Sequence, residues 1–312
     1  MYLDADGARI ADQDVIERIK GLVIPPAWTG VWICPRENGH IQATGYDDAG
    51  RKQYLYHSRW SESRSARKFE TMLDFAQQLP RLRRAVARDL DPENLAMNSV
   101  LACGVRLIDL GNFRVGGEQY AAENETYGVA TIQKQHVTLG KSPDEIRFEY
   151  TGKGSLEHLV LIRDESIRAL ARRLLRRRSG PEDFLVFREE RRWVDVTADH
   201  LNSYIKENTD ERFSAKDFRT WRGTVLAAAS LAGSEIPTSA RGRDRSIRKA
   251  VETVAEELGN TPAVARSSYV DPRVFDLYRS GQVIAGSGRG TGRKARKGLS
   301  STEQAVRALL ST

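Results

Sequence analysis

The chain has 312 residues, which is enough for two domains with hydrophobic cores. Lysine and arginine total 49 against 42 acidic residues, and the formal net charge of +7 favours a polyanionic partner such as nucleic acid. The isolated Cys34 and Cys103 offer no disulfide framework or zinc-ligand spacing, the first residues show no signal-peptide pattern, and no stretch approaches the ~20 apolar residues of a membrane span. A disulfide-stabilised or membrane-spanning protein is therefore excluded, and we expect a cytoplasmic one.

The first seventy residues or so are predicted to form a small antiparallel sheet. Short extended runs are separated by Asn, Asp and Gly residues, which tolerate the backbone angles of tight hairpins. The runs are residues 31–34, 40–44 and 53–56, and the turns are residues 38–39 and 47–50.

A helical period begins near residue 67. The apolar residues that recur at helical spacing are Met72, Phe75, Leu79, Leu82 and Val86. Pro80 should break or restart this helix, because proline removes one main-chain hydrogen bond and its ring clashes with the preceding turn.

One β-island interrupts the helical remainder of the chain. Apolar and polar residues alternate over residues 145–150, residues 151–154 (Thr-Gly-Lys-Gly) form a turn, and an apolar run returns at 159–162. This pattern predicts a hairpin with Lys153 at its tip.

Capping residues mark the helices that follow. Ser214 with Asp217 three positions later resembles a capping box, which would begin one helix. Gly259 should end another helix, and residues 261–262 (Thr-Pro) should begin the next one. Tyr269 is therefore expected in or just beyond a short helix.

The elements together predict an α+β protein. A small antiparallel β-rich domain is expected at residues 1–70 and a larger, mainly helical domain at residues 71–285. Gly, Ser, Arg and Lys dominate from Gly281 through Lys297, so residues 286–312 are predicted to form a flexible basic tail.

Four segments carry residues suited to reversible cleavage of a phosphodiester. Such chemistry needs a nucleophile, positive charge on the phosphate oxygens and a proton for the leaving oxygen, and arginine supplies the charge where no metal does. The segments are residues 112–116 with Arg114, 150–154 with Lys153, 216–221 with Arg219, and 258–269 with Asn260 and Tyr269. Taken singly, each has an ordinary explanation: a salt bridge, a solvated turn or a half-buried aromatic ring.

Taken together, the segments resemble a known family. The order Arg, Lys, Arg, polar residue, Tyr is shared by type IB topoisomerases and tyrosine recombinases. From about residue 20 to about residue 278, the surrounding sequence is similar to the sequences of the small topoisomerases of bacteria and poxviruses. The matching segments are residues 24–28, 50–56, 113–116, 120–128, 134–136, 142–146, 152–154 and 216–220.

The resemblance implies a role for each candidate in a tyrosine recombinase/topoisomerase IB catalytic core. Tyr269 would attack the phosphate and form a 3′-phosphotyrosine, while Arg114 and Arg219 hold the phosphate oxygens. Lys153 would be the general acid that protonates the departing 5′-oxygen. Many relatives carry histidine where this chain has Asn260, whose amide can donate a hydrogen bond to a phosphate oxygen but can neither transfer a proton nor bear a charge.

The resemblance also assigns DNA binding to the N-terminal sheet, which would clamp the duplex. Gln53, Tyr54 and Tyr56, with the neighbouring Arg51, match family positions that face DNA. An ordinary alternating strand with Leu55 facing the core explains the same spacing equally well.

The sequence thus predicts a DNA topoisomerase of type IB that works on double-stranded DNA as a monomeric clamp. It would relax supercoils through transient single-strand cleavage, strand rotation and religation, with no cofactor, ATP or metal, in the cytoplasm at the nucleoid. A tyrosine recombinase or integrase is the alternative, although it would normally bring a helical N-terminal domain. A DNA-binding module without catalysis is disfavoured because Arg114, Lys153, Arg219 and Tyr269 are all present.

Overall fold

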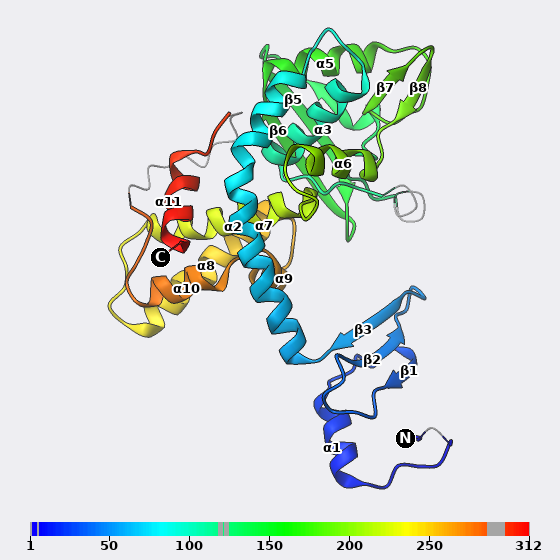
Figure 1. Ribbon diagram of the computed structural model, residues 1–312, viewed down its shortest axis with the longest axis vertical. Coiled ribbons are helices and arrows are strands. Elements are labelled where there is room, and N and C mark those ends of the chain that lie inside the picture. The colour runs from blue at the N-terminus through cyan, green and yellow to red at the C-terminus, as the bar shows by residue number, and fades with distance from the viewer. Residues whose placement is uncertain (1, 5, 118–120, 122–124, 286–296, 312) are drawn as a thin grey trace. The chain divides into compact units, whose positions relative to one another are not determined.

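The computed structural model describes residues 2–4, 6–117, 121, 125–285 and 297–311 (Figure 1). Contacts divide the chain into two compact units, Met1–Glu70 and Thr71–Thr312. The α+β prediction is confirmed, because antiparallel strands form the sheet of the first unit and helices make up most of the second.

The first unit combines a three-stranded antiparallel sheet with helix α1 (Gln13–Gly21) and the beginning of helix α2 (Ser58–Asp89). Its strands β1 (Thr29–Ile33), β2 (Ile41–Tyr46) and β3 (Lys52–Tyr56) pair in the order β1-β2-β3. The sequence reading missed helix α1, although Asp12 begins it by accepting hydrogen bonds from two main-chain N–H groups of the first turn.

Helix α2 (Ser58–Asp89) is continuous, so the prediction that Pro80 interrupts it is wrong. Around the proline, the apolar face of the helix is almost fully enclosed. The side chains of Phe75, Ala76, Leu79 and Leu82 are at most 1% exposed. Burial of this face outweighs the cost of about 3 kcal/mol that proline imposes inside a helix.

Helix α7 (Ala215–Ala232) contacts several other helices of the second unit. It packs against α3 (Met97–Gly111), α8 (Ala240–Leu258), α9 (Pro262–Tyr269) and α10 (Pro272–Arg279) (Figure 1). Helices α5 (Glu165–Arg176) and α6 (Ala198–Asn208) also belong to this unit. Within the described residues, no helix is long and apolar enough to cross a membrane.

The predicted hairpin is present, and two further β elements join the second unit. Strands β5 (Glu145–Gly152) and β6 (Leu156–Arg163) form the hairpin with Lys153 in its turn, and β4 (Val137–Leu139) pairs with β5. A separate hairpin consists of β7 (Val186–Glu189) and β8 (Arg192–Asp195). The prediction of a single β-island is therefore wrong, because β4, β7 and β8 are too short to show a clear alternation.

Helix α11 (Ser301–Leu310) forms where the sequence predicted a flexible tail, and for these residues that prediction is wrong. Ser300 and Glu303 form a reciprocal capping box that begins the helix. Its buried face consists of Thr302, Glu303, Val306 and Leu310. Residues 286–296 of the predicted tail lie outside the described residues.

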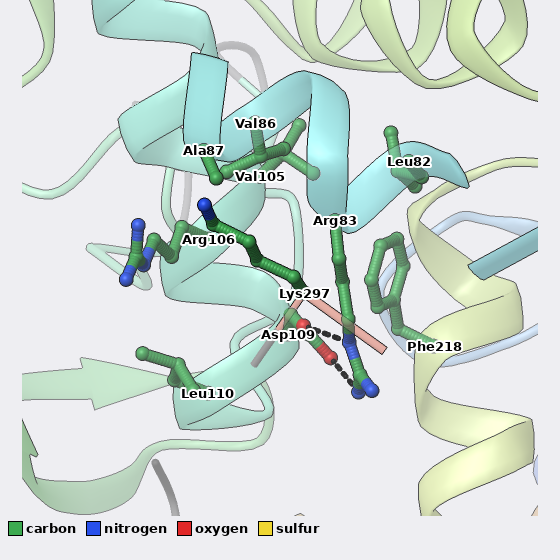
Figure 2. A pocket seen from close by; sticks show the side chains of 10 residues that line it. All are labelled: Leu82, Arg83, Val86, Ala87, Val105, Arg106, Asp109, Leu110, Phe218 and Lys297. Carbon is green, nitrogen blue, oxygen red and sulfur yellow. Dashed lines mark hydrogen bonds and ion pairs between the residues drawn. The ribbon is translucent and has the colours of Figure 1, made fainter. Parts of the chain in front are cut away.

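A buried ionic network attaches α11 to the rest of the unit. Arg83 on α2 donates hydrogen bonds to both Asp109 on α3 and Glu303 on α11, and Figure 2 shows Arg83 meeting Asp109. The Nε1 group of Trp221 on α7 donates a third side-chain hydrogen bond to Glu303, of 3.1 Å. One carboxylate therefore joins α11 to α2 and α7.

Candidate active site

Arg114 is held beside Asn260 by the way α3 ends. Asn112 caps this helix in the left-handed conformation (φ 57°), so the chain turns away and leads into Arg114. The Nη2 group of Arg114 donates hydrogen bonds of 2.9 Å to the Gly259 carbonyl and to Oδ1 of Asn260. Two candidates from distant parts of the sequence are therefore in direct contact.

The main chain around Arg114 is fixed by a close approach of two glycines. A Cβ built on Gly128 would lie 2.6 Å from the Cα of Gly116 and 2.7 Å from the Arg114 carbonyl, so position 128 has no room for a side chain. Next to it, Tyr127 N–H donates to the Thr151 carbonyl in the Lys153 hairpin, at 2.8 Å. Residues 120 and 122–124 of the matching segment 120–128 lie outside the described residues.

Arg219 is a buried cation near the start of α7, only 4% exposed. Its Nη1 and Nη2 groups donate hydrogen bonds of 2.6 Å to the carbonyls of Asn112 and Leu258. Its Nε–H has no hydrogen-bond partner in the described part of the chain. A buried guanidinium bound only to carbonyls is poorly compensated, so the surroundings of Arg219 favour an anion.

Tyr269 is the last residue of α9, as the capping pattern predicted. Thr261 caps this helix by accepting from the Val264 N–H, and Pro262 occupies its first turn. The guanidinium carbon of Arg219 lies 5.1 Å from the centre of the half-buried Tyr269 ring. At this distance the guanidinium is attracted to the face of the ring, so the positive charge of Arg219 lies next to the candidate nucleophile.

Lys153 is exposed in the turn between β5 and β6. Gly154 (φ 83°) and Ser155 (φ 56°) adopt positive φ values in this turn. The hairpin strands, rather than burial of its own side chain, therefore determine where Lys153 lies. Through Thr151, these strands are joined to the segment that carries Arg114.

A cavity of about 250 Å³ behind the arginines contains a residue that the sequence reading missed. Its lining includes Arg114, Arg219 and His158, a half-buried residue of β6. Burial and the charges of the two arginines lower the pKa of His158, against an opposing effect of Glu157. The only available signal was cross-strand pairing, which places His158 opposite Tyr150 in the hairpin.

Metal-ligand geometry is a separate matter. Among the described residues, no group of three or more His, Cys, Asp and Glu side chains is placed to hold a metal ion. Arg114, Arg219 and Lys153 are the cationic side chains among the candidate catalytic residues.

The four predicted DNA-binding residues fall into two groups in the first unit. Tyr54 and Tyr56 are exposed on one face of β3, at 45% and 37%. Arg51 and Gln53 instead bond to the carboxylate of Asp47, Arg51 at 3.0 Å and Gln53 at 2.8 Å. The tyrosines are available to a partner, whereas Arg51 and Gln53 hold the turn between β2 and β3.

Three aromatic rings of the first unit are stacked on one another. Tyr56 lies between Tyr54 and Trp60, with ring centres 6.2 Å and 4.3 Å away. Across the sheet, Tyr54 pairs with Thr44, which in turn pairs with the exposed Trp32. The face that carries Tyr54 and Tyr56 is therefore an exposed aromatic surface.

Comparisons with known proteins identify the family of the chain. A family model described as "Eukaryotic DNA topoisomerase I, catalytic core" matches residues 57–278, and one described as "Bacterial DNA topoisomerase IB, N-terminal domain" matches residues 1–47. DNA topoisomerase 1B of Acanthamoeba polyphaga mimivirus is 33% identical over 276 residues, which cover 85% of this chain and 80% of the relative. DNA topoisomerase 1B of vaccinia virus (strain Copenhagen) is 22% identical over 237 residues, covering 75% and 71%. The chain therefore belongs to the type IB family of DNA topoisomerases.

Proposed function

We propose that this type IB topoisomerase relaxes supercoiled double-stranded DNA through Tyr269. The phenol oxygen attacks a backbone phosphate, a bond forms between the tyrosine and the 3′-phosphate, and the bond to the 5′-oxygen breaks. The cut strand rotates, and the 5′-hydroxyl then reverses the reaction. Because the phosphotyrosine keeps the energy of the phosphoester, resealing needs no ATP.

The observation that carries this proposal is the position of Arg219. Its buried guanidinium lies over the Tyr269 ring and is bound only to main-chain carbonyls in the described residues. Each Nη group retains a second hydrogen, and Nε–H is unused. An anionic phosphate beside Tyr269 would provide the compensation that this cation lacks.

The other candidates complete the site around the phosphate. Arg114 would add a second guanidinium, and Asn260 would donate from Nδ2, one hydrogen of which binds the Leu258 carbonyl at 3.3 Å. Lys153 would deliver a proton to the 5′-oxygen, which is a poor leaving group as an alkoxide. The attacking phenol loses its own proton as its bond to phosphorus forms.

The first unit would bind the same duplex, so that the protein acts as a monomeric clamp. Tyr54 and Tyr56 would contact DNA from the exposed aromatic surface. Arg51 and Gln53 would support this contact from their positions on Asp47. We further propose association with the nucleoid, in keeping with the net charge of +7.

Relaxation of a supercoiled plasmid in EDTA, without nucleotide, tests this function. Trapping with denaturant should recover protein attached to a 3′ end. DNA binding should weaken steeply with salt, and for each neutralised phosphate the logarithm of the binding constant should fall by about 0.9 per tenfold rise in salt concentration. A strict requirement for magnesium or ATP would contradict the mechanism. Activity only on plasmids with a special site, with joining of two sites, would favour a recombinase instead.

A further inference from the structure

His158 fills the space between two glycines on different elements. A Cβ built on Gly152 would lie 2.5 Å from its Nε2, and one built on Gly259 would lie 2.5 Å from its Cε1. Both distances are far below ordinary van der Waals contact, so the ring lies directly against both main chains. Tyr150 stacks on the ring, with centres 5.1 Å apart and planes inclined by 18°.

Each of these glycines adjoins a residue of the proposed site. Gly152 is the last residue of β5 and directly precedes Lys153. Gly259 caps α8 with φ 59°, precedes Asn260, and its carbonyl accepts a hydrogen bond from Arg114. A single imidazole therefore separates the Lys153 hairpin from the turn that holds Arg114 and Asn260.

Packing holds the imidazole in this place. No hydrogen bond joins the imidazole to another of the described residues, whereas the ring lies against the two glycines and stacks on Tyr150. Burial together with the charges of Arg114 and Arg219 keeps its pKa below the ordinary value. Near neutral pH the ring is uncharged and packs beside two guanidinium groups without repelling them.

We propose that His158 is a positioning residue that sets the distance from the Lys153 hairpin to the phosphate site. This inference rests on the proposed role of Lys153 as the proton donor. Lys153 is exposed at a turn, so the packing beneath the hairpin determines its reach. A displacement of about 1 Å in such a group can slow a reaction about 10²-fold.

Cleavage of two substrates under single-turnover conditions tests the proposal. On ordinary DNA at saturation, His158→Ala should cleave about 10–100-fold more slowly than the unchanged protein. In a second substrate, sulfur replaces the bridging 5′-oxygen. Its leaving group is a thiolate, whose conjugate thiol has a pKa of about 8.5, so the leaving group departs without being protonated. Sulfur should therefore restore most of the rate of both His158→Ala and Lys153→Ala, but little of the rate of Arg114→Ala.

A matched control separates positioning from general stability. His200 on α6 is another half-buried histidine, and its ring packs against Phe187 with centres 5.6 Å apart. His200→Ala should lower the melting temperature without a rate defect that sulfur corrects. His158→Phe, which keeps a flat ring and removes both nitrogens, should retain most of the cleavage rate on ordinary DNA.

A pair of variants tests the contact itself. Gly152 lies in β5 outside the left-handed region, so Gly152→Ala adds only a methyl group that overlaps the His158 ring. This variant alone should slow cleavage of ordinary DNA. In the His158→Ala background the space is vacant, so adding Gly152→Ala should cause little further loss.

The outcomes distinguish the two proposals. If sulfur fails to rescue Lys153→Ala, the proposed role of Lys153 is wrong. If sulfur rescues Lys153→Ala but not a folded His158→Ala, Lys153 keeps its role and the positioning role of His158 is overturned. Additive losses in Gly152→Ala and His158→Ala would also overturn it.

Discussion

Gly223 lies directly against the main chain of Tyr269, because a Cβ at position 223 would fall 2.5 Å from the Tyr269 carbonyl oxygen. Gly223 stands one turn after Arg219 on α7. The same helix therefore sets the place of the proposed nucleophile and of the buried arginine beside it.

Gly223→Ala should displace the end of α9 and slow strand cleavage by about 10²-fold, while non-covalent DNA binding changes little. The measurement is single-turnover cleavage at saturating protein. Gly233 at the end of α7 is a matched control, since a Cβ there would meet no atom closer than 3.5 Å. Equal cleavage rates for Gly223→Ala and Gly233→Ala would show that the close approach is unimportant.

Tyr269→Phe should abolish relaxation and the covalent adduct while leaving DNA binding nearly intact, because only the nucleophilic oxygen is lost. Tyr278→Phe provides the control, since the Tyr278 hydroxyl is buried and has no hydrogen-bond partner in the described residues. The control should relax plasmid at the normal rate. An adduct that persists in Tyr269→Phe would place the nucleophile elsewhere.

Asn260→Asp should slow cleavage more than Asn260→Ala does. The new carboxylate would replace an amide whose oxygen already accepts a hydrogen bond of 2.9 Å from Arg114, so it would neutralise that guanidinium and repel the phosphate. We expect a loss of about 10²–10³-fold for the aspartate, from single-turnover rates at saturation. If alanine proves as slow as aspartate, the amide's own hydrogen bond rather than local charge dominates.

Glu303→Gln should lower the free energy of unfolding at neutral pH by about 1.5–3 kcal/mol, because Glu303 accepts charge-assisted hydrogen bonds from Arg83. Burial would raise the pKa of Glu303, but the hydrogen bonds and charge of Arg83 outweigh it and hold the pKa below the ordinary value of 4.5. The stabilisation is therefore complete above about pH 4.5 and is lost as the pH falls through the lowered pKa.

Denaturant unfolding as a function of pH checks this expectation. The difference between the unchanged protein and Glu303→Gln should be large at neutral pH and shrink in acid, since glutamine does not titrate. Glu93→Gln is the exposed control, because its partner Arg173 lies at the surface and such pairs contribute less than about 1 kcal/mol. A difference that stays constant with pH would mean that the charge of Glu303 is not involved.

The sequence predicted those features that depend on local chemistry. The capping box at Ser214 and the helix end at Gly259 follow from the hydrogen bonds that their own side chains or backbone can make, and both are present. The Lys153 hairpin could be predicted because its strands are long enough to show an alternation of apolar and polar residues. The order of the candidate residues likewise indicated the family before any distance was known.

Features that depend on distant partners could not be predicted in this way. Helix α2 continues through Pro80 because its apolar face packs on residues far along the chain. Helix α11 carries a capping box that the sequence analysis overlooked, and its attachment to Arg83 and Trp221 depends on residues far along the chain. The position of His158 could not be predicted either, because it depends on folding that brings Gly152 and Gly259 together around its ring.

The attachment of α11 has a consequence for the order in which the protein becomes competent. A ribosome releases residues from the N-terminus onward, so Tyr269 and every other proposed site residue emerge before Ser301–Leu310. Until α11 has been made, α7 lacks the carboxylate that Trp221 and Arg83 share. We therefore expect a nascent chain that stops before α11 to hold α2 and α7 together less firmly than the 312-residue chain does.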